Sequence, residues 1–253
     1  ASLFTHINMG LTLTLQNGIL FRTRNFEPDY RYTHNFIDMW SVDEIIILDI
    51  TRKLKFGDKN KKFFFKTLEQ ISKNIVVPLT VGGGIEKLDD IKTLLNNGAD
   101  KVVINSVALE SPKKINSFAS KYGKQCIVVS IDVKKIDNEF IVFTDYGTKK
   151  TNYKLKDWIK IVQDEGAGEI FLQSIEFDGS LEGYNYEMVN HISQVINLPL
   201  IVSSGAGNWK HFEKLFEFDF VSAASTTNIY HFTESSIKSL KNFLKTKKLE
   251  IRV

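Results

Sequence analysis

The sequence predicts an α/β protein folded as one closed (β/α)8 barrel, and three observations support this. The chain has 253 residues, a length at which such a barrel commonly forms a single domain. Apolar, strand-like runs alternate with segments of helical period, which is typical of a parallel sheet covered by helices. The two halves of the chain also repeat the same motifs. An open, doubly wound sheet is the structural alternative.

The strand-like runs are rich in Ile, Val, Leu and Phe and recur along the whole chain. They cover residues 11–15, 44–50, 77–81, 101–105, 126–132, 169–175, 198–202 and 218–224. Segments with apolar residues at helical spacing follow at 68–75, 87–98, 112–123, 155–166, 186–196, 209–218 and 235–246. Eight strand-like runs, most of them followed by a helical segment, match a (β/α)8 barrel of this length in number and in size.

The motifs in the stretch from residue 47 to 106 are repeated about 120 residues later, in the stretch from 171 to 226. Corresponding positions are Pro78 and Pro199, Gly84 and Gly205, Asp100 and Asp219, and Ser106 and Ser225. No short-period solenoid fits this spacing. The repeat therefore predicts one barrel domain over residues 1–253, made of two fused half-barrels at about 1–122 and 123–253.

Composition and charge exclude several classes of protein. A formal net charge of +3 is too small to argue for nucleic acid, and no apolar run approaches the ~18 residues of a membrane span. The first residues do not resemble a signal peptide, and the single Cys126 fits a reducing cytoplasm. The five histidines have no metal-like spacing, so neither a metal nor a cofactor is expected. The basic stretch 51–66 is either a solvated loop or a collar for an anionic ligand or an acidic partner.

Each half of the chain carries a glycine-rich loop directly after a strand, and such loops bind phosphate through their backbone N–H groups. A tight turn is the alternative reason for the glycines, but two loops at matching places predict a ligand with two anionic ends. We name these sites the first and second cradles. The first comprises Gly82, Gly83, Gly84, Asn105 and Ser106, and the second comprises Ser203, Ser204, Gly205, Gly207, Ala224 and Ser225.

Carboxylates at strand ends between the cradles are the candidates for acid–base catalysis. Asp132 follows a buried strand and has few structural duties there, so we expect a catalytic role. For Asp49 and Asp178, a role in bracing a loop is equally expected. The sequence lacks a Gly-x-Ser-x-Gly elbow, a P-loop and a Cys/His cluster, so hydrolase, NTPase and zinc-enzyme functions have no support.

Taken in order, the motifs LDIT, PLTVGGGI, NNGADKVVINS, VSIDVKK, EFIVFTDYGTKKT, GAGEIFLQSIEFDGS and LPLIVSSGAG resemble the HisF family over nearly the whole chain. This family comprises the cyclase subunits of imidazole glycerol phosphate synthase. The resemblance implies a TIM barrel that docks a HisH-type glutaminase and receives ammonia through its core. It also implies a substrate with two phosphates, in agreement with the two cradles.

The chain departs from the family at the catalytic residues. The family uses two aspartates, and Asp132 matches one of them, whereas Thr14 occupies the place of the other and is the half-barrel counterpart of Asp132. Threonine cannot take a proton near neutral pH, so the acid–base pair is broken. Arg22 stands for a family lysine and Gln173 for a threonine, and the loop at 24–40 is shorter than the family's flap.

The opposite face keeps more of the family pattern. Glu44, Lys101 and Glu169 match three of four charged residues around the ammonia entrance, and Asn8 stands for the fourth, an arginine. Asp100 matches a residue that docks the glutaminase. Buried charges are costly unless paired, so their presence suggests an entrance still in use. Inherited ion pairs that stabilise the barrel are the alternative.

This combination resembles the HisF-like paralogues of bacterial surface-sugar clusters, which act with a HisH-like glutaminase and a separate amidotransferase. The resemblance implies delivery of ammonia for conversion of an N-acetyl group into an acetamidino group on a phosphorylated or nucleotide-linked sugar. Two alternatives stay open: an authentic cyclase, and a scaffold that only activates its glutaminase.

Overall fold

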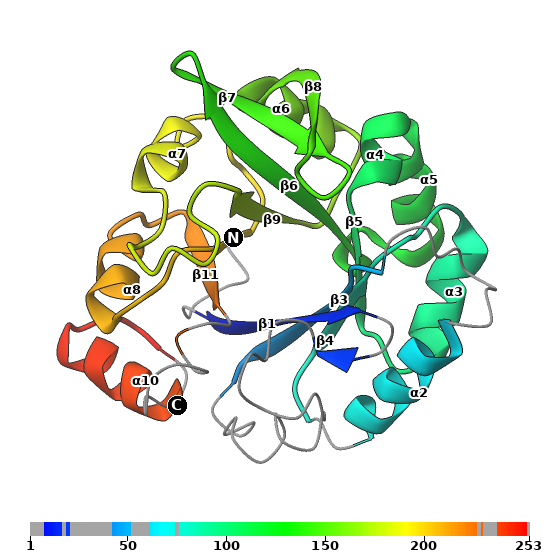
Figure 1. The fold of residues 1–253 in the computed structure, drawn as a ribbon, viewed down its shortest axis with the longest axis horizontal. Helices are drawn as coiled ribbons and strands as arrows, with labels where there is room; N and C mark the ends of the chain where they lie inside the picture. The colour runs from blue at the N-terminus through cyan, green and yellow to red at the C-terminus, as the bar shows by residue number, and fades with distance from the viewer. Residues whose placement is uncertain are drawn as a thin grey trace.

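Eight parallel strands close into a barrel in the computed structural model, which describes residues 8–16, 19–20, 42–51, 61–73, 76–226, 229 and 237–251. The strands are β1 (Asn8–Gln16), β3 (Glu44–Asp49), β4 (Leu79–Gly82), β5 (Lys101–Ile104), β6 (Ile127–Ile136), β9 (Glu169–Ser174), β10 (Leu200–Ser203) and β11 (Val221–Thr226). Each strand pairs with the next barrel strand along the chain, including β5 with β6. The pairing of β1 with β11 then closes the barrel. The predicted barrel is therefore confirmed, and an open sheet is excluded (Figure 1).

Helices surround the strands in chain order (Figure 1). Leu155, Trp158, Ile159 and Val162 of α6 are buried, at the spacing that points one helical face toward the strands. Within the part of the chain that the structure describes, no helix has the length and apolar character needed to cross a membrane. The helices are α2 (Lys61–Ser72), α3 (Leu88–Asn96), α4 (Ser106–Glu110), α5 (Lys113–Tyr122), α6 (Leu155–Asp164), α7 (Tyr186–His191), α8 (Trp209–Leu215) and α10 (Ile237–Thr246), with a short 3-10 turn at Lys124–Cys126.

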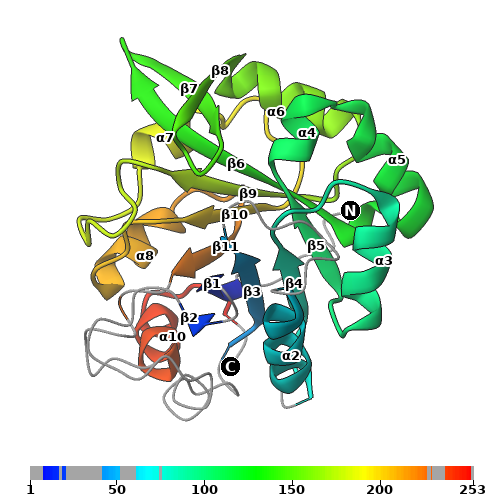
Figure 2. The ribbon, with the colours of Figure 1, turned by 45° about the vertical axis from the view of Figure 1, so that its right-hand side comes forward.

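The sequence analysis did not predict the hairpin that extends from β6. Strand β6 continues beyond the barrel and pairs antiparallel with β7 (Glu139–Thr144), which pairs with β8 (Lys149–Lys154). Asp137 and Asn138 join β6 to β7 with φ of 48° and 65°, as a two-residue type I′ turn requires. Figure 2 shows the hairpin standing out from one end of the barrel. A short strand, β2 (Ile19–Leu20), pairs antiparallel with β1.

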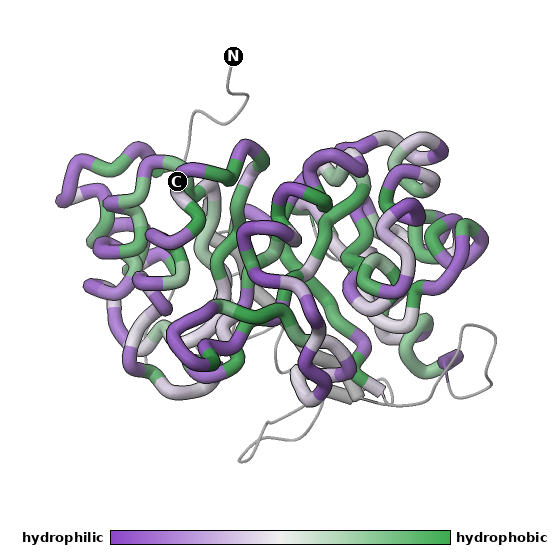
Figure 3. The backbone as a smooth tube through the Cα atoms, turned by 90° about the horizontal axis from the view of Figure 1, so that it is seen from above, coloured by the Kyte–Doolittle hydropathy of each residue, from purple (hydrophilic) through white to green (hydrophobic). Residues whose placement is uncertain are grey.

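The core has two parts, because successive strand side chains point alternately toward the helices and into the barrel. The larger part lies between strands and helices and includes Ile45, Ile47 and Trp158. The apolar character follows the strands in Figure 3, whereas polar segments lie on the outer helices and loops. We name the smaller part, inside the barrel, the interior layer. It consists of Ile46, Val103, Val128, Phe171, Ile201 and Ala223.

The strand register is the same in the two halves of the barrel. Gly10 pairs with Glu44 in the first half, and Val128 pairs with Glu169 in the second. Four residues farther along, Thr14 pairs with Leu48 and Asp132 pairs with Gln173. Thr14 and Asp132 thus occupy equivalent backbone positions. This supports the hypothesis of two half-barrels, and their division near residue 122 stays a prediction.

A buried ion pair ties the last described helix to the barrel. The Nζ atom of Lys241 in α10 lies 2.8 Å from Oδ1 of Asp43, just before β3, and each side chain is only 4% exposed. Substituting Lys241 breaks this buried pair, and breaking a buried pair by removing one partner costs about 3–5 kcal/mol. We therefore expect Lys241→Met to lower the free energy of unfolding by about this amount in urea denaturation.

The control is Lys247→Met, which breaks the more exposed pair between Lys247, directly after α10, and Glu213 of α8, at 3.0 Å. Exposed pairs contribute under about 1 kcal/mol, so this variant should stay close to the wild type. Equal losses in the two variants would contradict a special role for the buried pair.

Candidate functional site

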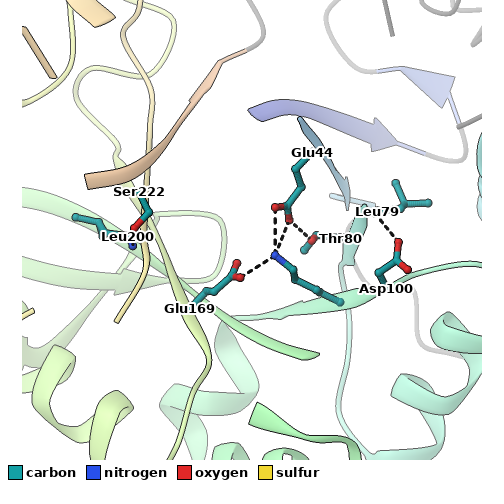
Figure 4. Close-up of polar contacts among 8 residues, drawn as sticks. Glu44, Leu79, Thr80, Asp100, Glu169, Leu200 and Ser222 are labelled. Carbon is teal, nitrogen blue, oxygen red and sulfur yellow. Dashed lines mark hydrogen bonds and ion pairs between the residues drawn. The ribbon is translucent and has the colours of Figure 1, made fainter. Parts of the chain in front are cut away.

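Three charged residues meet inside the barrel at the amino-terminal end of the strands, and we name them the entrance cluster: Glu44, Lys101 and Glu169. Each is the first residue of its strand, β3, β5 or β9. The Lys101 ammonium lies between the two carboxylates, 3.1 Å from Oε2 of Glu44 and 2.7 Å from Oε1 of Glu169 (Figure 4). The structure thus brings together three residues that are far apart in the sequence.

Electrostatics in the entrance cluster favour a charged lysine. Burial alone would lower the pKa of Lys101, but the carboxylates of Glu44 and Glu169 outweigh burial and raise it. Burial raises the pKa of Glu169, and the negative charge of Glu44 adds to this, while Lys101 opposes both effects. The Thr80 hydroxyl donates to Oε1 of Glu44 at 2.6 Å, a contact that the sequence analysis missed.

Asp100, the candidate docking residue, lies outside this cluster and is exposed. Its Oδ2 accepts a hydrogen bond from the Leu79 N–H at 2.8 Å, which fixes the carboxylate against the start of β4. In the second half, the Ser222 hydroxyl oxygen accepts from the Leu200 N–H at 3.4 Å (Figure 4). Asp100 and Ser222 thus accept the same kind of hydrogen bond in the two halves, and Ser222, not the predicted counterpart Asp219, makes it in the second.

At the carboxyl-terminal mouth of the barrel, Asp132 contacts Asn105. The Asn105 amide donates to Oδ2 of Asp132 at 2.9 Å. Burial raises the pKa of Asp132 to about 6, and the charge of Asp178 adds to this, whereas hydrogen bonds from Asn105 and Ser130 oppose it. Oδ1 of Asn105 is buried without a hydrogen-bond partner among the described residues, so it can accept a hydrogen bond from a ligand or water.

The other mouth carboxylates have different surroundings. Asp49 ends β3 and is buried, 3.5 Å from the Lys61 Nζ, and its Oδ1 accepts from the Thr51 N–H at 3.0 Å. These contacts fit the loop-bracing role. Asp178 is exposed in the loop after β9. Gln173 is partly buried in β9, beside Asp132 in the strand register.

The first cradle follows β4, and packing explains part of its glycine content. A Cβ atom on Gly83 would lie 2.3 Å from the Asp49 carbonyl oxygen, so a side chain is excluded there whether or not a ligand binds. Gly84 is exposed, and its N–H makes no hydrogen bond to a described residue. Its amide is therefore available to an anion. Ser106 is also exposed and begins α4.

The second cradle has the same backbone shape. Ser204 and Gly205 have φ of 80° and 88°, as Gly83 and Gly84 have 118° and 68°. Ser203, Ser204, Gly205, Ala224 and Ser225 are all buried.

Its amide groups divide into two kinds. Among the described residues, no hydrogen-bond partner meets the N–H groups of Gly205 and Ala206, and buried amides rarely lack one. In contrast, the Gly207 N–H donates to Nδ1 of His211 at 3.1 Å, so it is already engaged within the chain.

The β7–β8 hairpin contacts the mouth on the side of the first cradle. The Thr144 hydroxyl donates to the Ser106 hydroxyl oxygen at 3.0 Å, and the Tyr146 hydroxyl donates to the Thr51 carbonyl at 3.3 Å. The sequence analysis missed this neighbourhood. The Asp137-Asn138 turn that joins β6 to β7, ahead of the apolar run at 140–143, was the available signal.

Several predicted site residues lie outside the described residues or are placed by their backbone alone. Arg22, the loop at 24–40 and most of the basic stretch, at 52–60, lie outside the described residues. Thr14 is placed by the backbone register of β1 only, and the same holds for Asn8. Among the described residues, no group of three His, Cys, Asp or Glu side chains could hold a metal ion.

The raised pKa of Asp132 makes the stability depend on pH. The folded chain holds this proton more tightly than the unfolded chain, so the group's contribution is fully present below about pH 4 and is lost as the pH rises through about 6. Asp132→Asn removes the ionised form. We expect this variant to be more stable than the wild type at pH 8, by up to about 2 kcal/mol, and similar at pH 4.

Urea denaturation at the two pH values measures this difference. Asp137→Asn, in the exposed turn, is the control and should show no such change with pH. A constant difference between Asp132→Asn and the wild type from pH 4 to pH 8 would contradict the raised pKa.

Comparison with known proteins identifies relatives of the whole barrel. The family model described as "Histidine biosynthesis protein" matches residues 7–236. A protein of Natranaerobius thermophilus named "Imidazole glycerol phosphate synthase subunit HisF" is 42% identical over 216 residues, 85% of this chain and 84% of the relative.

Two further relatives carry the same name. The protein of Flavobacterium johnsoniae is 40% identical over 247 residues, 95% of this chain and 96% of its own length. The protein of Thermotoga sp. (strain RQ2) is 36% identical over 246 residues, 95% of each chain. With matches of this extent, the chain belongs to the HisF family.

Proposed function

We propose that the chain is the ammonia-receiving subunit of a glutamine amidotransferase. A HisH-type glutaminase docks at the amino-terminal end of the barrel, near Asp100 and the entrance cluster, and releases ammonia there. The ammonia passes along the barrel interior to the mouth. It is then used in the cytoplasm to convert an N-acetyl group of a bacterial surface sugar into an acetamidino group.

The observation that carries this proposal is the equivalence of Thr14 and Asp132 in the strand register. At this position the second half-barrel has a carboxylate, Asp132, whereas the first half-barrel has Thr14. General acid–base chemistry with one carboxylate from each of these two equivalent positions is therefore unsupported, although the entrance cluster is fully paired. This combination favours a subunit that supplies ammonia over one that carries out the cyclase reaction.

The interior layer suits neutral ammonia. The six described side chains that define it are apolar, and they lie between the charged entrance and the polar mouth. A charged ammonium ion would lose its hydration there at high cost, whereas a small neutral molecule would not. The two carboxylates outnumber the Lys101 ammonium, so the entrance can attract an ammonium ion, which gives its proton to water before neutral ammonia enters the layer.

The mouth supplies sites for an anionic acceptor. The available amides of Gly84, Gly205 and Ala206 support binding of phosphate groups, as a nucleotide-linked or phosphorylated sugar would present. Amidination replaces the carbonyl oxygen of the N-acetyl group by nitrogen, so this oxygen must first receive a phosphoryl or nucleotidyl group and then leave with it. We assign that activation to a separate amidotransferase that uses a nucleoside triphosphate.

A second function is the cyclase reaction itself, and one observation favours it. The charge of Asp178 helps to raise the pKa of Asp132, so the two carboxylates are electrostatically coupled. Asp178 is a candidate to replace the partner that Thr14 does not provide. The name that these relatives carry, a subunit of imidazole glycerol phosphate synthase, also fits this function.

Turnover of the histidine-pathway substrate with ammonium salts separates the two functions. We expect none from the wild type. In Thr14→Asp, a gain of about 100-fold over background is expected if only the missing carboxylate prevents the reaction, since acid–base groups commonly contribute 10²–10⁴-fold. The double variant Thr14→Asp/Asp132→Asn is the control and should lose any gain. Robust wild-type turnover would refute the sugar function.

Lys101→Met tests the entrance cluster. In a system reconstituted with glutaminase, amidotransferase and an N-acetylated nucleotide sugar, we expect glutamine-driven product formation to fall about tenfold, roughly the effect of losing one charged contact. Product formation driven by added ammonium chloride should stay within about twofold, because this nitrogen bypasses the entrance. The control is Lys73→Met, which removes an exposed pair with Glu69 on α2. Equal losses with both nitrogen sources would count against an entrance at this point.

A further inference from the structure

Lys61 is a buried lysine that neither the sequence analysis nor the family pattern singled out. It is the first residue of α2 and is only 2% exposed, although it comes from the most basic stretch of the chain. A buried ammonium group is costly unless it is paired and hydrogen-bonded. Its contacts therefore indicate what it does.

The Lys61 ammonium joins the end of β3 to the first cradle. Its Nζ donates to the Gly83 carbonyl oxygen at 2.9 Å and lies 3.5 Å from Oδ2 of Asp49. The two loops also touch directly, since the space beside Gly83 is filled by the Asp49 backbone. Lys61 thus neutralises a carboxylate next to an anion site and holds the loop of that site.

The hydrogen bond to Gly83 fixes the direction of the next amide. In a planar trans peptide, the carbonyl group and the following N–H point to opposite sides. With the Gly83 carbonyl turned inward to Lys61, the Gly84 N–H must point away from it. A charged donor on the carbonyl also polarises the peptide and strengthens this N–H as a donor.

The second cradle is held in a different way. The Gly205 carbonyl accepts from the Gly183 N–H at 2.7 Å, a bond between backbone groups. In the same cradle, the buried hydroxyl oxygen of Ser204 accepts a hydrogen bond from the Ser174 N–H at 3.0 Å. A single side-chain change can therefore disturb the first cradle while the second keeps its support.

We infer that Lys61 is the positioning residue of the first cradle: it orients the Gly83–Gly84 peptide so that the Gly84 N–H binds one anionic end of the ligand. This inference rests on the proposed binding of an anionic acceptor at the mouth. It adds that the first anion site depends on a buried charge from α2, whereas the second does not.

Titration of the ¹⁵N-labelled chain with inorganic phosphate tests the inference, with the Gly84 and Gly205 amide signals reporting on the two cradles. In Lys61→Met, we expect binding at Gly84 to weaken at least tenfold and binding at Gly205 to stay within twofold. The variant Lys61→Met/Asp49→Asn should behave alike, and it leaves no unpaired carboxylate in the site. Lys62→Met, an exposed neighbour on α2, is the matched control and should bind as the wild type does.

Each other outcome has a distinct meaning. If the wild type shows no phosphate-dependent shift at Gly84, the first cradle itself is wrong and the inference falls with it. If the wild type binds at Gly84 and the double variant binds equally well, only the role of Lys61 is overturned. Equal weakening at both cradles, or unfolding of both Lys61 variants, would make Lys61 a general structural residue and would also overturn the inference.

Discussion

The alternation of side chains along eight parallel strands is the constraint on which the rest of this structure depends. In a closed barrel, every second residue must point inward, so each strand contributes to a stack of layers along one axis. In β3, Glu44 lies in the entrance cluster and Ile46 in the interior layer. In β9, Glu169 and Phe171 repeat this order. A polar entrance, an apolar layer and a polar mouth follow from a two-residue period.

The two half-barrels share this layering but differ at the mouth, in the residue at the equivalent strand position and in the contacts that hold each glycine loop. Thr14 and Asp132 hold equivalent backbone positions, and only one of them can exchange a proton near neutral pH. The glycine loops have the same backbone shape, yet one is held by the Lys61 ammonium and the other by a backbone hydrogen bond. A repeated fold therefore gives an asymmetric mouth, which suits a ligand with two unlike ends.

The sequence was sufficient to predict the parts of the fold that have a strong local signal. Apolar runs located all eight barrel strands, because strands buried on both faces need continuous apolar residues. The hairpin was missed for the opposite reason: Lys149, Lys150 and Lys154 of β8 are exposed, so their pattern resembles a loop.

Contacts between residues far apart in the sequence could not be predicted either, because local sequence patterns carry no information about them. Lys61 and Lys62 are adjacent in one basic stretch, and only the fold makes one buried and the other exposed. The positions in the entrance cluster came from family resemblance, but their hydrogen-bond geometry needed the structure.

The chemistry required at the mouth explains why one carboxylate suffices for the proposed function. When ammonia attacks a carbonyl carbon, its nitrogen becomes positively charged and must lose a proton. A group with a pKa of about 6 is mostly ionised at neutral pH and can accept that proton, as Asp132 would. The HisF family pattern has a second aspartate where Thr14 stands, and threonine cannot exchange a proton near neutral pH. The burial that raises the pKa of Asp132 thus reduces stability at neutral pH and, in the same step, brings the group into the range of a general base.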